Sequence, residues 1–133
     1  MTRRGKSLLT CMAVGSIAVA GCNPSGTEPR EFVIQIDSIR TPSAVSGGTA
    51  FQAFLFGPVG PDGCYRFKEF RVTRGPGEAD ITVVGESTSG MCTAMPVYLK
   101  GQPLTVDPPI TAPFTFRVRQ PTGAVLTKTI PAE

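Results

Sequence analysis

Glycine and proline interrupt this chain so often that a long helix cannot form in most of it. Beyond the N-terminal apolar run, no stretch of ten residues keeps apolar side chains at helical spacing without one of these two residues. Both residue types end regular elements and mark turns. Short apolar stretches between regularly spaced turns are typical of sandwiches and barrels. The sequence therefore predicts an all-β fold, a single antiparallel β-sandwich of seven or eight strands.

The expected strands alternate apolar and polar residues or are rich in β-branched and aromatic residues. They span residues 32–39, 49–56, 64–74, 79–85, 91–99, 102–106, 114–119 and 124–130. Residues 57–63, which are mostly Gly and Pro, are predicted to form a loop that joins no ladder. Pro96 favours an edge or a bulge in the fifth strand. The last two strands are expected to form a hairpin.

The third expected strand changes phase in its middle. Tyr65 and Phe67 share one parity, whereas Phe70 and Val72 share the other. One inserted residue would return all four side chains to the core, because side chains alternate along a strand. The sequence therefore predicts a β-bulge near Lys68 and Glu69.

The N-terminus combines basic residues, a short apolar run and a cysteine. Arg3, Arg4 and Lys6 precede an apolar run from residue 8 to residue 20, and Val19-Ala20-Gly21-Cys22 closes it. This segment resembles the signal peptide of bacterial lipoproteins, with residues 19–22 as the lipobox. The resemblance implies a signal peptide over residues 1–21, cleavage after Gly21 and a diacylglyceryl group on Cys22. An ordinary secretory signal, with Cys22 present by chance, is the alternative.

The same resemblance implies a place in the cell and a division of the chain. The lipid on Cys22 would anchor the protein to a membrane of the cell envelope. Asn23, where aspartate tends to retain lipoproteins in the inner membrane, favours the outer membrane of a diderm cell. In a cell with one membrane, the protein would face outward from it. Residues 22–31 are predicted to be the lipidated cysteine with a flexible tether, and residues 32–133 the β-sandwich domain.

Two further cysteines remain once Cys11 leaves with the signal and Cys22 carries lipid. An even pair in an exported domain predicts a disulfide between Cys64 and Cys92, which would link the third and fifth strands. A metal or redox pair is disfavoured, because the chain has no histidine and no third cysteine lies nearby. The domain resembles immunoglobulin-like sandwiches in architecture only, since it lacks tryptophan and its cysteine spacing is shorter.

The composition of the chain argues against several classes of function. Without Arg3, Arg4 and Lys6, ten basic residues balance ten acidic ones, so no nucleic-acid partner is expected. No residue is predicted to be catalytic, since a serine nucleophile in the 85–89 segment would lack a histidine base. No cofactor or metal is expected either. A hydrolase that uses Glu78, Asp80 or Glu86 is the least favoured hypothesis.

Four basic residues cluster in the third expected strand: Arg66, Lys68, Arg71 and Arg74. They could contact anionic groups. Charges of this kind on a strand more often serve solubility and discourage edge pairing, which is the interpretation favoured here.

The second expected strand is apolar on both faces, with Phe51, Ala53 and Leu55 on one and Phe54 and Phe56 on the other. A simple sandwich strand has one wet face. Phe54 and Phe56 are therefore either covered by the 57–63 loop or the tether, which is the favoured interpretation, or exposed as a partner surface.

These features favour a membrane-anchored envelope lipoprotein whose non-catalytic sandwich binds or assists another envelope protein. The alternative is an inhibitor or a small-ligand or glycan-binding lipoprotein that uses the loops next to Cys64 and Cys92, namely residues 57–63 and 87–91. Glycan binding is disfavoured because the only tyrosines, Tyr65 and Tyr98, are predicted to be buried.

Overall fold

A computed structural model describes residues 28–133, and the predictions for residues 1–27, including the lipobox and Cys22, lie outside this range. The described residues form eight strands and no helix, as the Gly and Pro pattern predicts. The strands are β1 (Arg30–Val33), β2 (Ser38–Arg40), β3 (Phe51–Gly60), β4 (Tyr65–Arg74), β5 (Glu78–Ser87), β6 (Val97–Val106), β7 (Phe114–Arg119) and β8 (Val125–Ile130).

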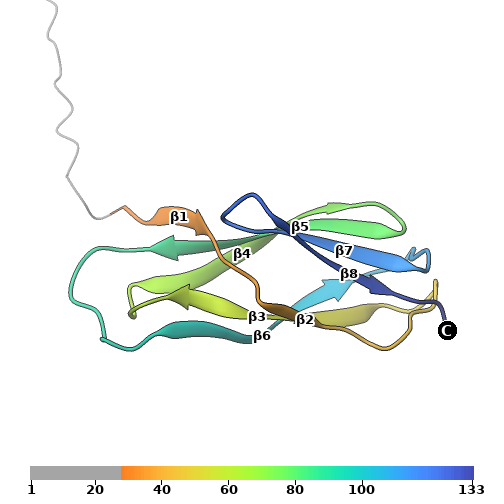
Figure 1. Cartoon of the computed structure of the whole chain (residues 1–133), viewed down its shortest axis with the longest axis horizontal. Helices are drawn as coiled ribbons and strands as arrows, with labels where there is room; N and C mark the ends of the chain where they lie inside the picture. The colour runs from red at the N-terminus through yellow and green to blue at the C-terminus, as the bar shows by residue number, and fades with distance from the viewer. Residues whose placement is uncertain (1–27) are drawn as a thin grey trace, which may run out of the picture.

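The strands form two sheets that face each other (Figure 1). The larger sheet is built around β5, which pairs with β4 along its length, with β1 over its C-terminal half and with β7 over its N-terminal half. β8 continues this sheet beyond β7. The smaller sheet has the order β2-β3-β6. This arrangement is consistent with the predicted β-sandwich.

One sheet is mixed, so the prediction of a wholly antiparallel sandwich is wrong. β5 and β7 pair in parallel, with Glu78 opposite Thr115 and Thr82 opposite Arg119. Between these strands the chain crosses to the smaller sheet as β6 and returns. A parallel pair needs such a crossover, whereas antiparallel neighbours can be joined by a tight turn. The predicted final hairpin, β7–β8, is antiparallel and confirmed.

The first expected strand is two strands in different sheets. β1 belongs to the larger sheet and β2 to the smaller one, and residues 34–37 cross between them. The domain also begins earlier than predicted, because Arg30 and Glu31, assigned to the tether, pair with β5.

The side chain of Gln120 satisfies the backbone where the chain crosses. Its Oε1 accepts a hydrogen bond from Ile36 N–H and its Nε2 donates one to Ile36 C=O, both at 3.0 Å. Gln120 therefore replaces the ladder partner that Ile36 lacks between two sheets. Ile36 itself is buried in the core.

We expect Gln120→Leu to lower the free energy of unfolding by about 2–4 kcal/mol, because it leaves two buried backbone groups of Ile36 unpaired. Urea denaturation measures this loss. Gln52→Leu is the matched control, since the exposed Gln52 amide makes only a long hydrogen bond of 3.4 Å to Thr105. Equal stabilities of the two variants would contradict this role of Gln120.

Two other predicted boundaries are wrong. Residues 57–60, predicted to be loop, extend β3 and pair with β6. Pro58, which has no N–H, is tolerated there because β2 pairs only with residues 54–56 of β3. At Pro58 the edge of β3 that faces β2 therefore has no ladder partner that needs an N–H. At the other boundary, residues 91–96 lie in a loop, and a single strand spans residues 97–106.

The close approach of two backbones explains why Gly57 stands in this strand. A Cβ at Gly57 would lie much too close to the carbonyl oxygen of Gln35 in the crossing segment. Gly57 is also buried, so no side chain would have room to turn away. Glycine therefore marks a contact between segments here and does not mark a turn.

The predicted β-bulge is confirmed. The register between β4 and β5 shifts between Phe67 and Glu69, which leaves Lys68 as the additional residue. Tyr65, Phe67 and Phe70 consequently pack against the core, with the Phe67 and Phe70 ring centroids 4.9 Å apart. The prediction is wrong for Val72, which is 40% exposed.

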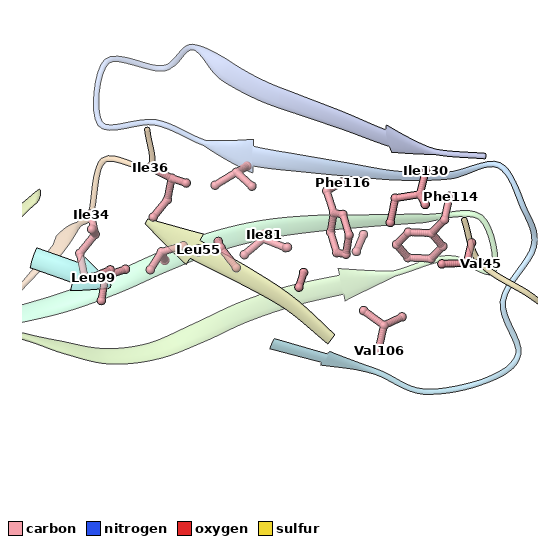
Figure 2. Close-up of a cluster of buried hydrophobic side chains, with 14 of the residues drawn as sticks. Ile34, Ile36, Val45, Leu55, Ile81, Leu99, Val106, Phe114, Phe116 and Ile130 are labelled. Atoms are coloured by element: carbon pink, nitrogen blue, oxygen red, sulfur yellow. The ribbon is translucent and has the colours of Figure 1, made fainter. Parts of the chain in front are cut away.

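The core lies between the two sheets and is entirely apolar (Figure 2). Phe114 and Phe116 of β7 are fully buried, and their rings pack edge to face, 5.1 Å apart. Phe51 of β3 completes the aromatic group from the opposite sheet, at 5.5 and 6.0 Å from the same rings. The side chains of one sheet thus interdigitate with those of the other, as sandwich packing requires.

Candidate functional site

The predicted disulfide between Cys64 and Cys92 is confirmed, with the two Cα atoms 5.4 Å apart. It does not join two strands as expected. Cys64 lies in the turn before β4, and Cys92 lies in the loop between β5 and β6. The disulfide therefore fixes a loop to a turn at one end of the domain.

Backbone hydrogen bonds hold the same loop and turn together. Gly63 N–H donates to Thr93 C=O at 2.9 Å, and Thr88 N–H donates to Cys64 C=O at 3.0 Å. The Asp62 carboxylate accepts from Cys64 N–H at 2.8 Å, which closes an Asx turn. Asp62 lies near both sulfurs, but a disulfide offers no thiolate for a metal ion.

The loop held in this way exposes two methionines that the sequence analysis did not single out. Met91 is 105% exposed and Met95 is 70% exposed. The absence of charged residues from Ser87 to Leu99 was a sequence signal that could have drawn attention to this loop. Exposed large apolar side chains on one loop can mark an interaction site.

Phe54 and Phe56 lie on the outer face of the smaller sheet and are half-buried. The favoured interpretation, that the 57–63 loop or the tether covers both rings, is wrong in part. Residues 57–60 extend the same strand and so cannot fold over it, and residues 28–33 run in or toward the other sheet. Tether residues 22–27 lie outside the described range.

The cross-strand neighbours of these rings extend the surface. Pro103 pairs with Phe54, Lys100 with Phe56 and Tyr98 with Pro58, and directly opposite residues share a face. Tyr98 is 53% exposed, so the prediction that it is buried is wrong. Tyr65 is partly buried against the core. We call seven of the outward residues of this sheet the aromatic face: Arg40, Phe54, Phe56, Pro58, Tyr98, Lys100 and Pro103.

The charge on the aromatic face has one sign. The Arg40 guanidinium lies 5.3 Å from the centroid of the Phe56 ring, a cation–π geometry. Arg40 and Lys100 are the only charged residues of β2, β3 and β6, which contain no carboxylate. A shallow hollow of about 350 Å³ beside Phe56 is also lined by Arg40 and Lys128. This face therefore suits a partner that is apolar and acidic.

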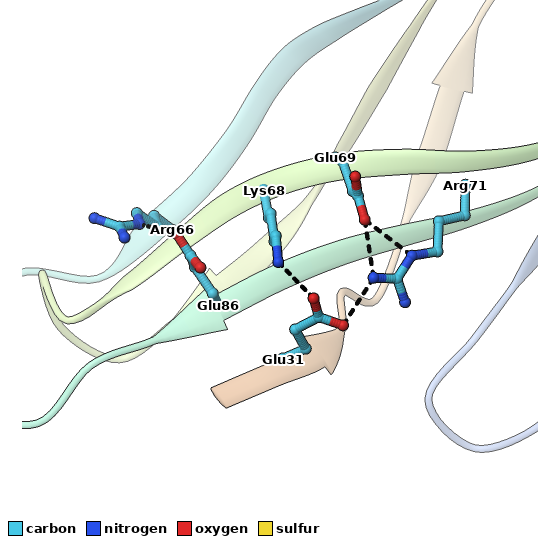
Figure 3. Close-up of polar contacts among 6 residues, drawn as sticks. All are labelled: Glu31, Arg66, Lys68, Glu69, Arg71 and Glu86. Carbon is cyan, nitrogen blue, oxygen red and sulfur yellow. Dashed lines mark hydrogen bonds and ion pairs between the residues drawn. The ribbon is translucent and has the colours of Figure 1, made fainter. Parts of the chain in front are cut away.

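The outer face of the larger sheet differs, because its charges pair with each other (Figure 3). The Glu31 carboxylate of β1 contacts Lys68 and Arg71 of β4, at 2.5 and 2.8 Å. Arg71 also pairs with Glu69, and Arg66 pairs with Glu86. Three residues of the basic cluster are thus paired with carboxylates and do not form a free cationic surface, while their role in solubility stays a prediction.

The fourth member of that cluster, Arg74, connects the two sheets. Its guanidinium donates hydrogen bonds to the carbonyl oxygens of Gly75, Asp107 and Pro109. It also lies 5.0 Å from the centroid of the Phe114 ring. Arg74 also lines a largely apolar groove of about 670 Å³ between β4 and β6, at the end of the domain away from the disulfide.

The structure brings no catalytic group together from the three carboxylates considered. Glu78 pairs with Arg117 at 3.3 Å, and Glu86 pairs with Arg66. Asp80 lies on the same outward face of β5 as Glu78 and Glu86. These carboxylates lie along an open sheet face, whereas a glycosidase needs two across the bond that it cleaves.

The ion pairs of Glu31 predict a pH dependence. Hydrogen bonds from Lys68 and Arg71 lower the pKa of Glu31 from its usual 4.5. A lowered pKa contributes stability above the unfolded-state value, and this is lost as the pH falls through the folded-state value. The stability gap between wild type and Glu31→Gln should therefore be constant at neutral pH and close below about pH 4.5.

Urea denaturation at several pH values measures this gap. Glu28→Gln, which changes an exposed carboxylate ahead of β1, is the control. The gap should be small, because the pairs are exposed to solvent. A gap that persists unchanged in acid would contradict the role given to the Glu31 carboxylate.

Comparison with known proteins gives no relative: no protein-family model, no curated protein and no solved structure matches the chain. Nor do residues 28–133 contain a helix with the length and apolar character needed to cross a membrane.

Proposed function

We propose that this protein is a lipid-anchored protein of the cell envelope whose non-catalytic domain binds a partner protein through the aromatic face. The anchor would be a diacylglyceryl group on Cys22, placing the domain at the outer membrane of a diderm cell or outside the membrane of a cell with one. The immunoglobulin-like likeness in architecture belongs to the same proposal. One observation carries the binding role: the aromatic face is half-exposed, cationic and free of carboxylates.

The contrast between the two sheets supports this assignment. The outer face of the larger sheet carries acidic and basic residues that neutralise each other, which suits a surface that faces water. The aromatic face instead combines Phe54, Phe56 and Tyr98 with two cations. Aromatic residues and arginine are the types enriched where proteins bind one another.

A photo-reactive phenylalanine analogue in place of Phe56 tests the proposal in native membranes. We expect a discrete adduct with one envelope protein, and no adduct when the analogue replaces exposed Thr127 of β8. When the analogue replaces Tyr98 instead, the Phe54→Ser, Phe56→Ser double substitution should abolish the adduct. The double substitution should lower the free energy of unfolding by about 1–2 kcal/mol per ring, because each ring is only half-buried.

Two results would count against the aromatic face. One is crosslinking at position 56 that is no stronger than at position 127. The other is a double variant that unfolds, since a loss well above the expected total of about 2–4 kcal/mol would show that the rings serve packing.

The loops next to Cys64 and Cys92 are the second candidate, as an inhibitor or ligand-binding site. The observation in favour is the exposure of Met91 and Met95 on a loop that the disulfide holds. A restrained loop loses little conformational entropy on binding. Crosslinking from position 91 to a protein, with none from position 56, would favour this candidate.

A further inference from the structure

The N-terminal end of the described chain and the methionine loop lie at the same end of the domain (Figure 1). Arg30, the first residue of β1, pairs with Ser87, the last residue of β5. The loop from residue 88 to residue 96 follows directly, and the disulfide fixes it to the turn before β4. A shallow hollow lined by Glu28, Arg30 and residues 87–89 marks where the entering chain meets the loop.

The number of residues before this point limits how far it can lie from Cys22. Six residue steps separate Cys22 from Glu28. A fully extended chain covers at most about 3.6 Å per residue, so this distance cannot exceed roughly 20 Å. If Cys22 carries lipid, this end of the domain stays within that distance of the bilayer.

The chemistry of this end suits the boundary between lipid and water. Met91 is fully exposed and Met95 is 70% exposed, and no residue from Ser87 to Leu99 is charged. Tyr98, which follows the loop, is exposed as well. Tyrosine is enriched at membrane interfaces, and methionine adapts its flexible side chain to irregular apolar surroundings.

We propose that Met91 and Met95 insert into the interfacial region of a phospholipid bilayer and so orient the anchored domain with its disulfide-linked end against the membrane. This inference rests on the proposed lipid at Cys22. The lipid supplies the attachment, and the loop sets the orientation. The outer face of the smaller sheet then stands roughly upright from the bilayer, where a partner protein can reach it.

Two side chains suffice for this purpose because the anchor has already brought the loop to the surface. A tethered contact is intramolecular, so even a weak insertion is populated at the high effective concentration that a short tether provides. The disulfide also reduces the entropy cost, because it restrains the loop before it meets lipid.

The insertion is apolar and not electrostatic. The loop itself has no cation to attract anionic headgroups. Of the arginines near this end, Arg66 is paired with Glu86, and Arg30 lines the same hollow as Glu28. Contact with lipid should therefore not weaken as salt is raised, in contrast to adsorption through basic residues.

Tryptophan fluorescence offers a direct test, since the chain contains no tryptophan. The lipidated protein is purified as Met91→Trp, Met95→Trp or Val125→Trp, and each is reconstituted into phosphatidylcholine vesicles with or without brominated acyl chains. Val125 is the control because it is 52% exposed but lies away from the methionine loop. It pairs with Arg119, and Arg119 pairs with Thr82, which precedes the end of β5 by five residues.

We expect brominated lipid to remove most of the emission at positions 91 and 95, with a blue shift that is unchanged in high salt. Emission at position 125 should keep its intensity. Unquenched emission at 91 and 95, or equal quenching at all three positions, would overturn the inference. Quenching that high salt abolishes would overturn it too, since it would indicate electrostatic adsorption.

The unaltered protein gives an independent readout. Met91 and Met95 are the only methionines after Cys22, so peroxide converts only this loop to sulfoxide, with water as the by-product. Oxidation should be slower on vesicles than after proteolytic release of the domain, and equal rates would contradict insertion.

The outcomes also separate this inference from the proposed anchor. Acylated protein whose loop stays in water would refute insertion and leave the anchor standing. Native protein without lipid on Cys22 would refute the anchor, and with it the reason for the loop to meet a bilayer.

Discussion

Phe114→Ala should lower the free energy of unfolding by about 3–5 kcal/mol, the usual cost of removing a fully buried phenylalanine ring. The Phe114 ring packs edge to face against Phe51 and Phe116 and lies beneath the Arg74 guanidinium. Its removal takes away apolar contacts from both sheets and leaves a cavity between them. Urea denaturation measures the loss as a lower midpoint with an unchanged slope.

Val125→Ala is the control for this experiment, because Val125 is an exposed apolar residue of the neighbouring strand β8. It should change stability by no more than about 0.5 kcal/mol. If Phe114→Ala were as mild as its control, the two sheets would not share the core described here.

Cys64→Ala with Cys92→Ala should cost about 3–4 kcal/mol, since the disulfide closes a loop with a sequence separation of 28 residues. The loss arises mainly in the unfolded chain, which gains freedom when the cross-link is absent. It therefore appears in urea denaturation as a lower midpoint. Reduction of the wild-type protein should give a similar loss.

The same double variant has a local consequence that Phe114→Ala lacks. Without the disulfide, residues 88–96 lose their covalent link to the turn before β4 and keep the backbone hydrogen bonds from Gly63 to Thr93 and from Thr88 to Cys64. Amide exchange should therefore accelerate in this loop more than in β5 or β7. Unchanged stability together with unchanged loop exchange would contradict the part given to the disulfide.

The local sequence pattern was sufficient to predict several features of this fold. The phase change between Phe67 and Phe70 predicts the β4 bulge, because only an extra residue returns both rings to the core. The turn residues 120–123 predict the β7–β8 hairpin. The pairing of Cys64 with Cys92 follows from counting cysteines in a chain that is expected to be exported. Each of these depends on residues close in sequence or on simple elimination.

The errors concern contacts between distant segments. The crossing between β1 and β2 depends on Gln120, which lies 84 residues from Ile36. Extension of β3 through Gly57 depends on the backbone of Gln35, which no local pattern reports. The parallel pairing of β5 with β7 follows from the path of β6 through the other sheet. Such features are set by tertiary packing, which overrides local propensity.

The candidate site also combines features that the local sequence predicts with features that tertiary contacts decide. Alternation along β3 predicts that Phe54 and Phe56 share an outward face, but whether anything covers them depends on where residues 57–60 run. Tyr98 joins them only through the β3–β6 register. The exposure of Met91 and Met95 has no periodic signature, since a loop has none, and it follows from how the disulfide and its hydrogen bonds place the loop.

Mass spectrometry of the protein isolated from its native membrane tests the proposed anchor most directly. We expect an N-terminal peptide that begins at Cys22, with Gly21 and all preceding residues removed and the mass of a diacylglyceryl group added to the cysteine. A peptide that continues through Gly21 into Cys22, or one that begins at Cys22 with an unmodified thiol, would contradict the proposed anchor.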